Sequence, residues 1–170
     1  GVLLGYMLGG DDARFLAGLA EALDHYGAPL LGGDTVSGPA GAQALGLTAI
    51  GRATHCPVPS RGGAQAGDRV WITGPVGGAM LGFEALQAGE GDSLAYRRPQ
   101  ALLAEGQALA GVVSAMMDVS DGLLLDASRI ARASGVTLAI ESAAVPIATP
   151  EPRRAEALRW GDDYQLLFTM

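Results

Sequence analysis

The apolar positions of the chain fall into short segments with two kinds of spacing. Segments in which apolar residues are continuous or alternate predict strands over residues 1–8, 29–31, 42–52, 69–73, 112–117, 136–140 and 164–169. Segments in which they recur every three or four positions predict helices over residues 11–27, 79–87, 97–110, 121–134 and 151–158. Because strands and helices alternate along the chain, we predict an α/β (α+β) fold.

A Gly- and Pro-rich segment divides this pattern. Residues 54–67 have little periodicity and are predicted to be a linker, which leaves 1–53 as part of a first domain and 68–170 as part of a second. The apolar strand 1–8 is too hydrophobic to remain a bare sheet edge. We therefore expect the first domain to dimerise through its sheet.

Composition narrows the function classes. With 49% hydrophobic and 17% charged residues among 170, the chain can form a packed core. All 11 basic residues are Arg, which excludes a Schiff-base lysine and a Walker-type phosphate lysine. The 18 acidic residues outnumber them, and no basic stripe is present, so nucleic acid is an unfavoured partner. No stretch approaches the ~20 apolar residues of a membrane span. A single cysteine and the absence of a signal-like segment predict a cytoplasmic protein.

Aspartates follow several of the predicted strands, and they are the candidate chemical groups. Asp34 follows Gly32-Gly33, Asp118 and Asp121 flank Ser120, and Asp162 precedes the last strand. Carboxylates in turns at strand ends can face a shared crevice, and Mg²⁺ prefers oxygen ligands and bridges to phosphate. For the Asp118–Asp121 turn, capping of the following helix by Ser120 is an equal alternative. Asp11 and Asp12 are expected to be helix caps rather than ligands.

Gly33 and Arg61 are candidates for phosphate contacts. Glycine lets the backbone approach a phosphate closely, and the planar Arg61 guanidinium can bind phosphate oxygens. Each has a plain alternative, because a Gly-Gly-Asp turn is common and a linker arginine is often only solvated.

Taken together, the turns resemble one family. Gly-Gly-Asp-Thr at 32–35, Arg-Gly-Gly-Ala-Gln-Ala-Gly-Asp at 61–68, Asp-Val-Ser-Asp-Gly at 118–122 and Gly-Asp-Asp-Tyr-Gln-Leu-Leu-Phe at 161–168 occur in this order. The order resembles thiamine-monophosphate kinases, in the superfamily of aminoimidazole-ribonucleotide synthetase and selenophosphate synthetase. The resemblance covers essentially the whole chain, and the combination is specific although each motif alone is not.

The resemblance implies an ATP- and Mg²⁺-dependent phosphorylation of thiamine monophosphate to thiamine diphosphate by direct in-line transfer. Such transfer depends on charge neutralisation and positioning, so no covalent nucleophile or other catalytic side chain is expected. The implied Mg²⁺ ligands are Asp34, Asp118 and Asp121, and the implied ATP contacts are Gly33, Asp34, Arg61 and Ser120. Asp162 stands where many members have Glu and is implied to contact the thiamine moiety; Trp160 replaces a Gly of that motif.

Family members extend beyond both ends of this sequence, and the missing segments carry a Gly-Asp-Asp element, a further metal-binding Asp and part of the thiamine enclosure. The resemblance therefore implies a fragment with weak or no activity by itself. Two other interpretations stay open: a different ATP-using synthetase of the superfamily, and a non-catalytic remnant that pairs with a partner.

Overall fold

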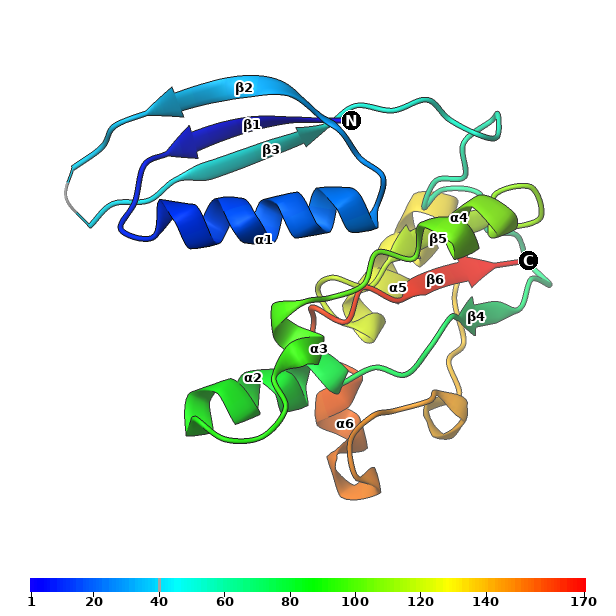
Figure 1. Cartoon of the computed structure of the whole chain (residues 1–170). Coiled ribbons are helices and arrows are strands. Elements are labelled where there is room, and N and C mark those ends of the chain that lie inside the picture. Colours follow the sequence, from blue (N-terminus) through cyan, green and yellow to red (C-terminus); the bar gives the residue numbers. More distant parts are fainter. Residues whose placement is uncertain (40) are drawn as a thin grey trace. The chain divides into compact units, whose positions relative to one another are not determined.

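The structure of the chain, a computed structural model, describes residues 1–39 and 41–170 (Figure 1). It contains two compact units, residues 1–53 (unit 1) and 54–170 (unit 2), and each is described by itself. Both combine small β-sheets with helices, which confirms the predicted α/β (α+β) fold class. In the part of the chain that the structure describes, no helix combines the length and the apolarity needed to cross a membrane.

Unit 1 is a three-stranded sheet with one helix along it (Figure 1). Its elements are β1 (Val2–Met7), α1 (Asp12–His25), β2 (Leu30–Val36) and β3 (Leu45–Ala49), in the sheet order β2-β1-β3. β1 pairs parallel with β2 and antiparallel with β3. Every second residue of β1 is buried, and the ring of Tyr6 stacks on Phe15 of α1 at a centroid distance of 4.7 Å.

The structure corrects two predictions in unit 1. β1 is the central strand and not an edge; the more exposed apolar side chains are on its neighbours, where Leu31, Leu45 and Leu47 are 52–56% exposed. Asp11 occupies the N-cap of α1 without a capping hydrogen bond from its side chain. The carboxylate of Asp12 accepts hydrogen bonds from the Tyr6 hydroxyl and from the amide of Gly9 (2.7 Å), so it fastens the β1–α1 turn rather than capping the helix.

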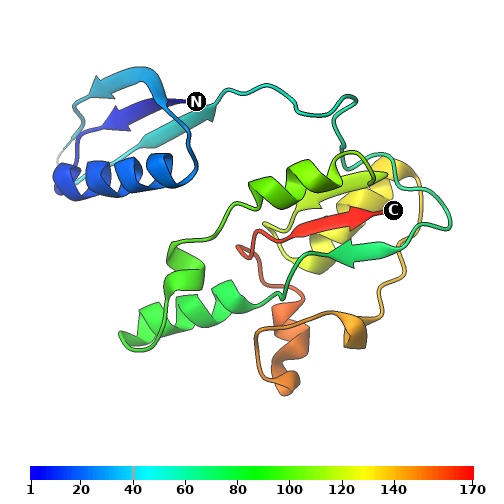
Figure 2. The same ribbon diagram turned by 45° about the vertical axis from the view of Figure 1, so that its right-hand side comes forward.

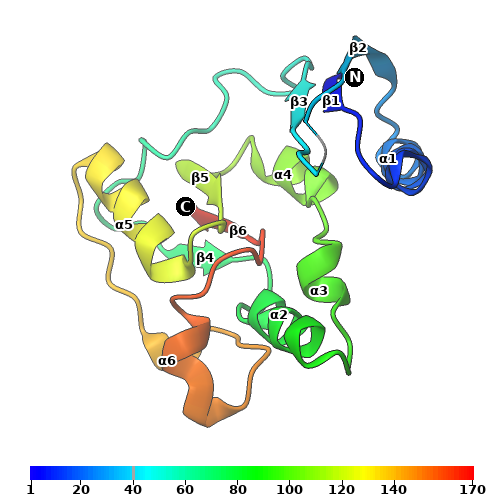
Figure 3. The same ribbon diagram turned by 90° about the vertical axis from the view of Figure 1, so that its left-hand side faces the viewer.

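Unit 2 contains a second three-stranded sheet, made of β4 (Val70–Ile72), β5 (Ala115–Asp118) and β6 (Leu166–Thr169). β6 is the central strand and pairs antiparallel with both neighbours. The helices are α2 (Gly78–Ala88), α3 (Leu94–Arg97), α4 (Leu103–Leu109), α5 (Leu123–Ser134) and α6 (Arg154–Ala157), with 3₁₀ turns at Ser142–Ala144 and Glu151–Arg153. α4 and α5 lie on opposite sides of this sheet (Figures 2 and 3).

The core of unit 2 forms where α5 packs on the sheet. Leu123, Ala127 and Ile130 recur at helical spacing on the inner face of α5, and they are buried together with Ala115 of β5 and Leu167 of β6. The packing fixes the start of α5 directly after β5. The end of β5 and the turn before α5 carry the Asp118–Asp121 motif.

Two predicted elements of unit 2 differ from the structure. Residues 136–140 form no strand, because no described strand pairs with their backbone; residues 137–141 and β4 instead line one groove of about 760 Å³. The predicted helix 97–110 is interrupted, with α3 ending at Arg97 and α4 beginning at Leu103. Pro99 explains the break, because the residue before a proline is disfavoured in helical conformation.

Part of the predicted linker is folded onto unit 2. The amide of Met116 donates to the carbonyl of Ser60 (2.9 Å), and the hydroxyl of Ser134, the last residue of α5, donates to the carbonyl of Arg61 (3.1 Å). The amides of Gly63 and Ala64 both donate to the same hydroxyl (3.1 Å each). The segment around Arg61 is therefore fixed beside the C-terminal end of α5.

Candidate functional site

The turn that follows β5 and the turn that precedes β6 lie side by side in unit 2. The amide of Asp162 donates to the carbonyl of Ser120 (3.0 Å), and the amide of Tyr164 donates to the carbonyl of Val119 (2.9 Å). The amide of Val119 in return donates to the carbonyl of Gln165 (2.8 Å). Turns more than 40 residues apart in the sequence thus share one backbone hydrogen-bond network.

Two glycines allow this close approach. Gly122 has φ +102°, which favours glycine, and a β-carbon there would overlap the carbonyl oxygen of Arg159. A β-carbon on Gly161 would overlap the carbonyl oxygen of Ser120. The glycines of the two motifs are therefore required by the packing of one turn on the other, independently of any ligand.

Three acidic side chains from the two turns influence the pKa of Tyr164. Burial is the first cause of the raised pKa of Tyr164, and the negative charges of Asp162, Asp118 and Asp121 raise it further. The Tyr164 hydroxyl donates to Asp162 at 3.4 Å. Asp162 and Tyr164 both have positive φ (63° and 51°), which is costly for residues with a side chain and is concentrated at functional sites. The structure thus brings together the predicted residues of the two turns.

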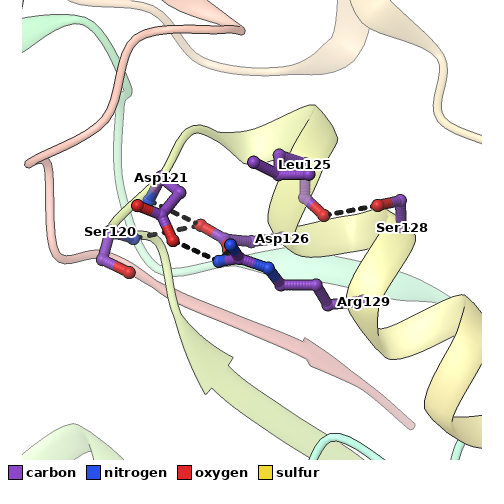
Figure 4. Close-up of polar contacts among 6 residues, drawn as sticks. All are labelled: Ser120, Asp121, Leu125, Asp126, Ser128 and Arg129. Atoms are coloured by element: carbon purple, nitrogen blue, oxygen red, sulfur yellow. Dashed lines mark hydrogen bonds and ion pairs between the residues drawn. The ribbon is translucent and has the colours of Figure 1, made fainter.

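The side chain of Asp121 is held by an arginine that the sequence did not single out (Figure 4). The Arg129 guanidinium, from the next turns of α5, donates to the carboxylates of Asp121 and Asp126. These hydrogen bonds, the one to Asp121 first, raise the pKa of Arg129 above its usual value. Asp121 is about half exposed (52%), so it remains accessible to a ligand despite this contact.

Asp126 completes this arrangement from inside the protein. It has no exposed surface, and one carboxylate oxygen accepts the backbone amides of Ser120 and Asp121 at 3.0 Å each (Figure 4). Asp126 shares the inner face of α5 with Leu123 and Ile130. An acidic residue at a core-facing position of an amphipathic helix was the sequence signal that could have identified it.

The structure decides against the capping interpretation of the Asp118–Asp121 turn. The N-cap of α5 is Gly122, and no side chain makes a capping hydrogen bond there. Within residues 1–39 and 41–170, the side chain of Asp118 takes part in no recorded hydrogen bond or ion pair, so its oxygens remain available.

A neighbouring acid, Asp163, has a structural role that sequence reasoning also missed. Its carboxylate accepts the amides of Gly77 (2.6 Å) and Ala79 (3.0 Å) at the start of α2. Burial raises the pKa of Asp163 although these amides act in the opposite direction. Trp160, at the other end of the motif, packs its ring against Phe83 of α2 with centroids 5.6 Å apart. The turn before β6 is thereby fastened to α2.

The carboxylates of this site could hold Mg²⁺ only together with water and a bound substrate phosphate. Across the described residues, no three His, Cys, Asp or Glu side chains gather closely enough to hold a metal ion. Mg²⁺ commonly uses only one or two carboxylates and completes its shell with water and substrate phosphates. Asp118 and Asp121 fit this pattern, with hard oxygen donors at the exposed end of β5.

The other predicted site residues lie elsewhere. Gly33 and Asp34 belong to unit 1, where a β-carbon on Gly33 would overlap the carbonyl of Leu4 and the carboxylate of Asp34 accepts the amide of Thr35 (2.9 Å). Arg61 is held beside the far end of α5, a helix of 12 residues and so about 18 Å long. Its contact with ATP, and the meeting of Asp34 with Asp118 and Asp121, stay predictions.

Comparison with known proteins decides the family. Residues 2–53 match the family model of the N-terminal domain of AIR synthase related proteins, and residues 65–170 match that of their C-terminal domain. The chain belongs to this family. The resemblance to thiamine-monophosphate kinases that the motifs indicate is confirmed as well, because the chain is similar to curated proteins named thiamine-monophosphate kinase.

The thiamine-monophosphate kinase of Escherichia coli K12 is 35% identical over 92% of the chain and 52% of its own length. The crystal structure of thiamine-monophosphate kinase from Stenotrophomonas maltophilia K279a superposes with a TM-score of 0.86 at 29% identity, covering 99% of this chain and 60% of that one. AaThiL complexed with AMPPCP and TMP superposes with a TM-score of 0.79 at 28% identity, again over 99% and 60%. The chain spans about half the length of the curated relatives it matches.

Proposed function

We propose that the chain is part of an ATP- and Mg²⁺-dependent kinase that converts thiamine monophosphate to thiamine diphosphate. The observation that carries the proposal is the superposition of 99% of the chain on AaThiL, whose structure holds the ATP analogue AMPPCP together with TMP. The identity of 35% to a curated thiamine-monophosphate kinase supports the same substrates.

The paired turns of unit 2 suit this chemistry. In the proposal, Asp118 and Asp121 hold Mg²⁺ together with Asp34, and Ser120, Gly33, Asp34 and Arg61 contact ATP. Asp162, one backbone hydrogen bond from Ser120, contacts the thiamine substrate. Bound Mg²⁺ would supply the charge neutralisation that lets two phosphates approach each other.

The chain needs no general base for this reaction. The attacking atom is an oxygen of a phosphate that is already largely ionised at neutral pH, so removing a proton contributes little. The contribution of the side chains is to orient and hold the two anions in line, which the shared backbone network of the two turns favours.

We also propose that the protein is a homodimer that associates through unit 1. Leu31, Leu45 and Leu47 of the two edge strands are more than half exposed. Leu31 lies on one edge of the sheet and Leu45 and Leu47 lie on the other, and a second copy that pairs with an edge would cover such exposed apolar side chains.

Calorimetry with the chain tests the nucleotide site. ATP is titrated in the presence and absence of Mg²⁺, with the wild type and with Asp118→Ala. We expect binding that requires the cation and that Asp118→Ala abolishes. Glu105→Ala, which removes an exposed acid of α4 in the same unit, is the matched control and should bind as the wild type does. Metal-independent binding, or unchanged binding by Asp118→Ala, would contradict the proposed Mg²⁺ site, whereas no binding of ATP under either condition would favour a non-catalytic remnant.

A further inference from the structure

Asp126 is a buried acid whose hydrogen bonds all lead to the candidate site. Among the described residues, it is the acidic side chain with no exposed surface (0%), and it lies on the inner face of α5. A carboxylate in such a position is costly unless its oxygens are hydrogen-bonded. Hydrophobic packing therefore does not explain why an aspartate occupies this position in the core.

The partners of Asp126 supply that explanation. Its Oδ2 accepts the amides of Ser120 and Asp121, both at 3.0 Å, and its Oδ1 accepts the Nη1 of Arg129 at 2.6 Å. The two amides belong to the turn between β5 and α5 that presents the candidate ligands. One oxygen therefore fixes the backbone of the turn, while the other binds an arginine.

Arg129 connects Asp126 to the side chain of Asp121. Its Nη1 also donates to the carboxylate of Asp121, so Asp126, Arg129 and Asp121 form a continuous hydrogen-bonded series (Figure 4). Arg129 is 31% exposed, whereas Asp121 is 52% exposed. The series thus runs from the core to the surface and ends on a candidate Mg²⁺ ligand.

We propose that Asp126 is the positioning residue of the Asp118–Asp121 turn: it fixes the amides of Ser120 and Asp121 and, through Arg129, the direction in which Asp121 presents its carboxylate to a divalent cation. The role of the cation rests on the function proposed above. The role in fixing the turn does not, because it follows from contacts within the chain.

The first test measures the turn without any ligand. Asp126→Asn keeps the shape of the side chain, but its amide nitrogen would face the Arg129 donor, so it cannot satisfy all three partners. We expect the amides of Ser120 and Asp121 to exchange hydrogen slowly in the wild type and faster in Asp126→Asn. Ser128→Ala, which removes only a hydroxyl bonded within α5 to Leu125, should leave both amides unchanged. Rapid exchange of both amides in the wild type would overturn the proposal, even if the variant fails to fold.

The second test measures Mn²⁺ binding by electron paramagnetic resonance, at a temperature where circular dichroism shows each variant folded. We expect Asp126→Asn to weaken Mn²⁺ binding about tenfold, as loss of outer-shell partners of metal ligands commonly does. Ser128→Ala should bind Mn²⁺ as the wild type does, and an unchanged affinity of Asp126→Asn would overturn the positioning role. If the wild type binds no Mn²⁺, the cation in the proposed function is contradicted, and the amide exchange alone decides whether Asp126 fixes the turn.

Discussion

Gly161 lies so close to Ser120 that a β-carbon on Gly161 would overlap the carbonyl oxygen of Ser120. The amide of Asp162 donates to that same carbonyl at 3.0 Å. The position of the turn carrying Asp162 therefore depends on the position of the turn carrying Asp118 and Asp121, and a change in one is transmitted to the other.

Substitution Gly161→Ala should separate the two turns. The added methyl has no space, so we expect a loss of roughly 1–3 kcal/mol in the free energy of unfolding, as for other overpacked sites. Urea unfolding of the chain measures it. Gly106→Ala in α4, where a β-carbon would make an ordinary 3.6 Å contact, is the control and should be neutral or slightly stabilising. Equal stability of the two variants would show that the turns can move apart freely.

Substitution Gly33→Ala distinguishes a structural from a nucleotide-binding need for glycine. The methyl would collide with the carbonyl of Leu4 in the neighbouring strand, so β1 and β2 should lose pairing and their amides should exchange faster. Gly46→Ala in β3, where nothing lies within 4 Å of the added carbon, should keep the sheet intact. If Gly33→Ala kept the sheet and lost only ATP binding, the structural explanation would be wrong.

Asp163 should make unit 2 less stable as pH rises. Its pKa is raised above the ordinary 3.8, chiefly by burial, so the folded chain binds this proton more tightly than the unfolded chain. The stability that the group contributes is present below 3.8 and is lost as pH rises through the folded-state pKa. Asp163→Asn should therefore gain stability relative to the wild type between pH 3 and pH 7, whatever the constant offset from its lost hydrogen bonds. A carboxyl ¹³C titration that puts the midpoint of Asp163 at or below 3.8 would refute this.

Arg153 should produce the opposite pH dependence. Its guanidinium donates to Glu84 of α2 and to Glu156 of α6 at 2.6 Å each, and these hydrogen bonds lower the pKa of both carboxyls below 4.5. Their contribution to stability is thus present above pH 4.5 and is lost on acidification. Arg153→Gln should lower the melting temperature most near neutral pH and low salt, with a difference from wild type that shrinks towards pH 3.

Calorimetric melting curves of Arg153→Gln at several pH values check this expectation. Arg132→Gln, which removes the same charge from an exposed position of α5, is the control. A difference between wild type and Arg153→Gln that is equal at pH 7 and pH 3 would show that the two ion pairs do not stabilise the fold.

Substitution Leu47→Arg should dissociate the proposed dimer. Leu47 is 53% exposed on β3, so the fold of the monomer should tolerate the change, whereas a buried leucine contributes about 1.5–3 kcal/mol to association. Analytical ultracentrifugation should show weaker self-association. Leu86→Arg on α2, 46% exposed in unit 2, should associate as the wild type does. A wild type that is monomeric at all concentrations would exclude the dimer.

Elements could be predicted from the sequence where the spacing of apolar residues follows the period of a helix or a strand. A helix over residues 121–134 and a strand over residues 1–8 were both predicted from apolar residues, and α5 and β1 lie within these ranges. Residues 136–140 have the same apolar character as a strand, but a strand also needs a partner, and pairing is a tertiary property. The interruption at Pro99 was local and could have been anticipated from the proline alone.

The candidate site was only half visible for a related reason. Aspartates in turns at strand ends could be recognised from their positions in the sequence, and backbone hydrogen bonds join the turn of Asp118 and Asp121 to the turn of Asp162. Asp126 was marked only by being an acid at a core-facing position of α5, and Arg129 is one of several arginines in the chain. Their importance follows from burial and from hydrogen-bond partners, which one sequence does not display.

The place of the central strand in each sheet has a consequence for synthesis on the ribosome. In unit 1 the central strand β1 precedes both of its partners, and all three strands have been synthesised once residue 49 is translated. In unit 2 the central strand β6 is made last, so β4 and β5 have no ladder until residues 166–169 appear. The sheet of unit 1 can therefore close early during synthesis, whereas β4 and β5 keep the edges that face β6 unpaired until β6 has left the exit tunnel.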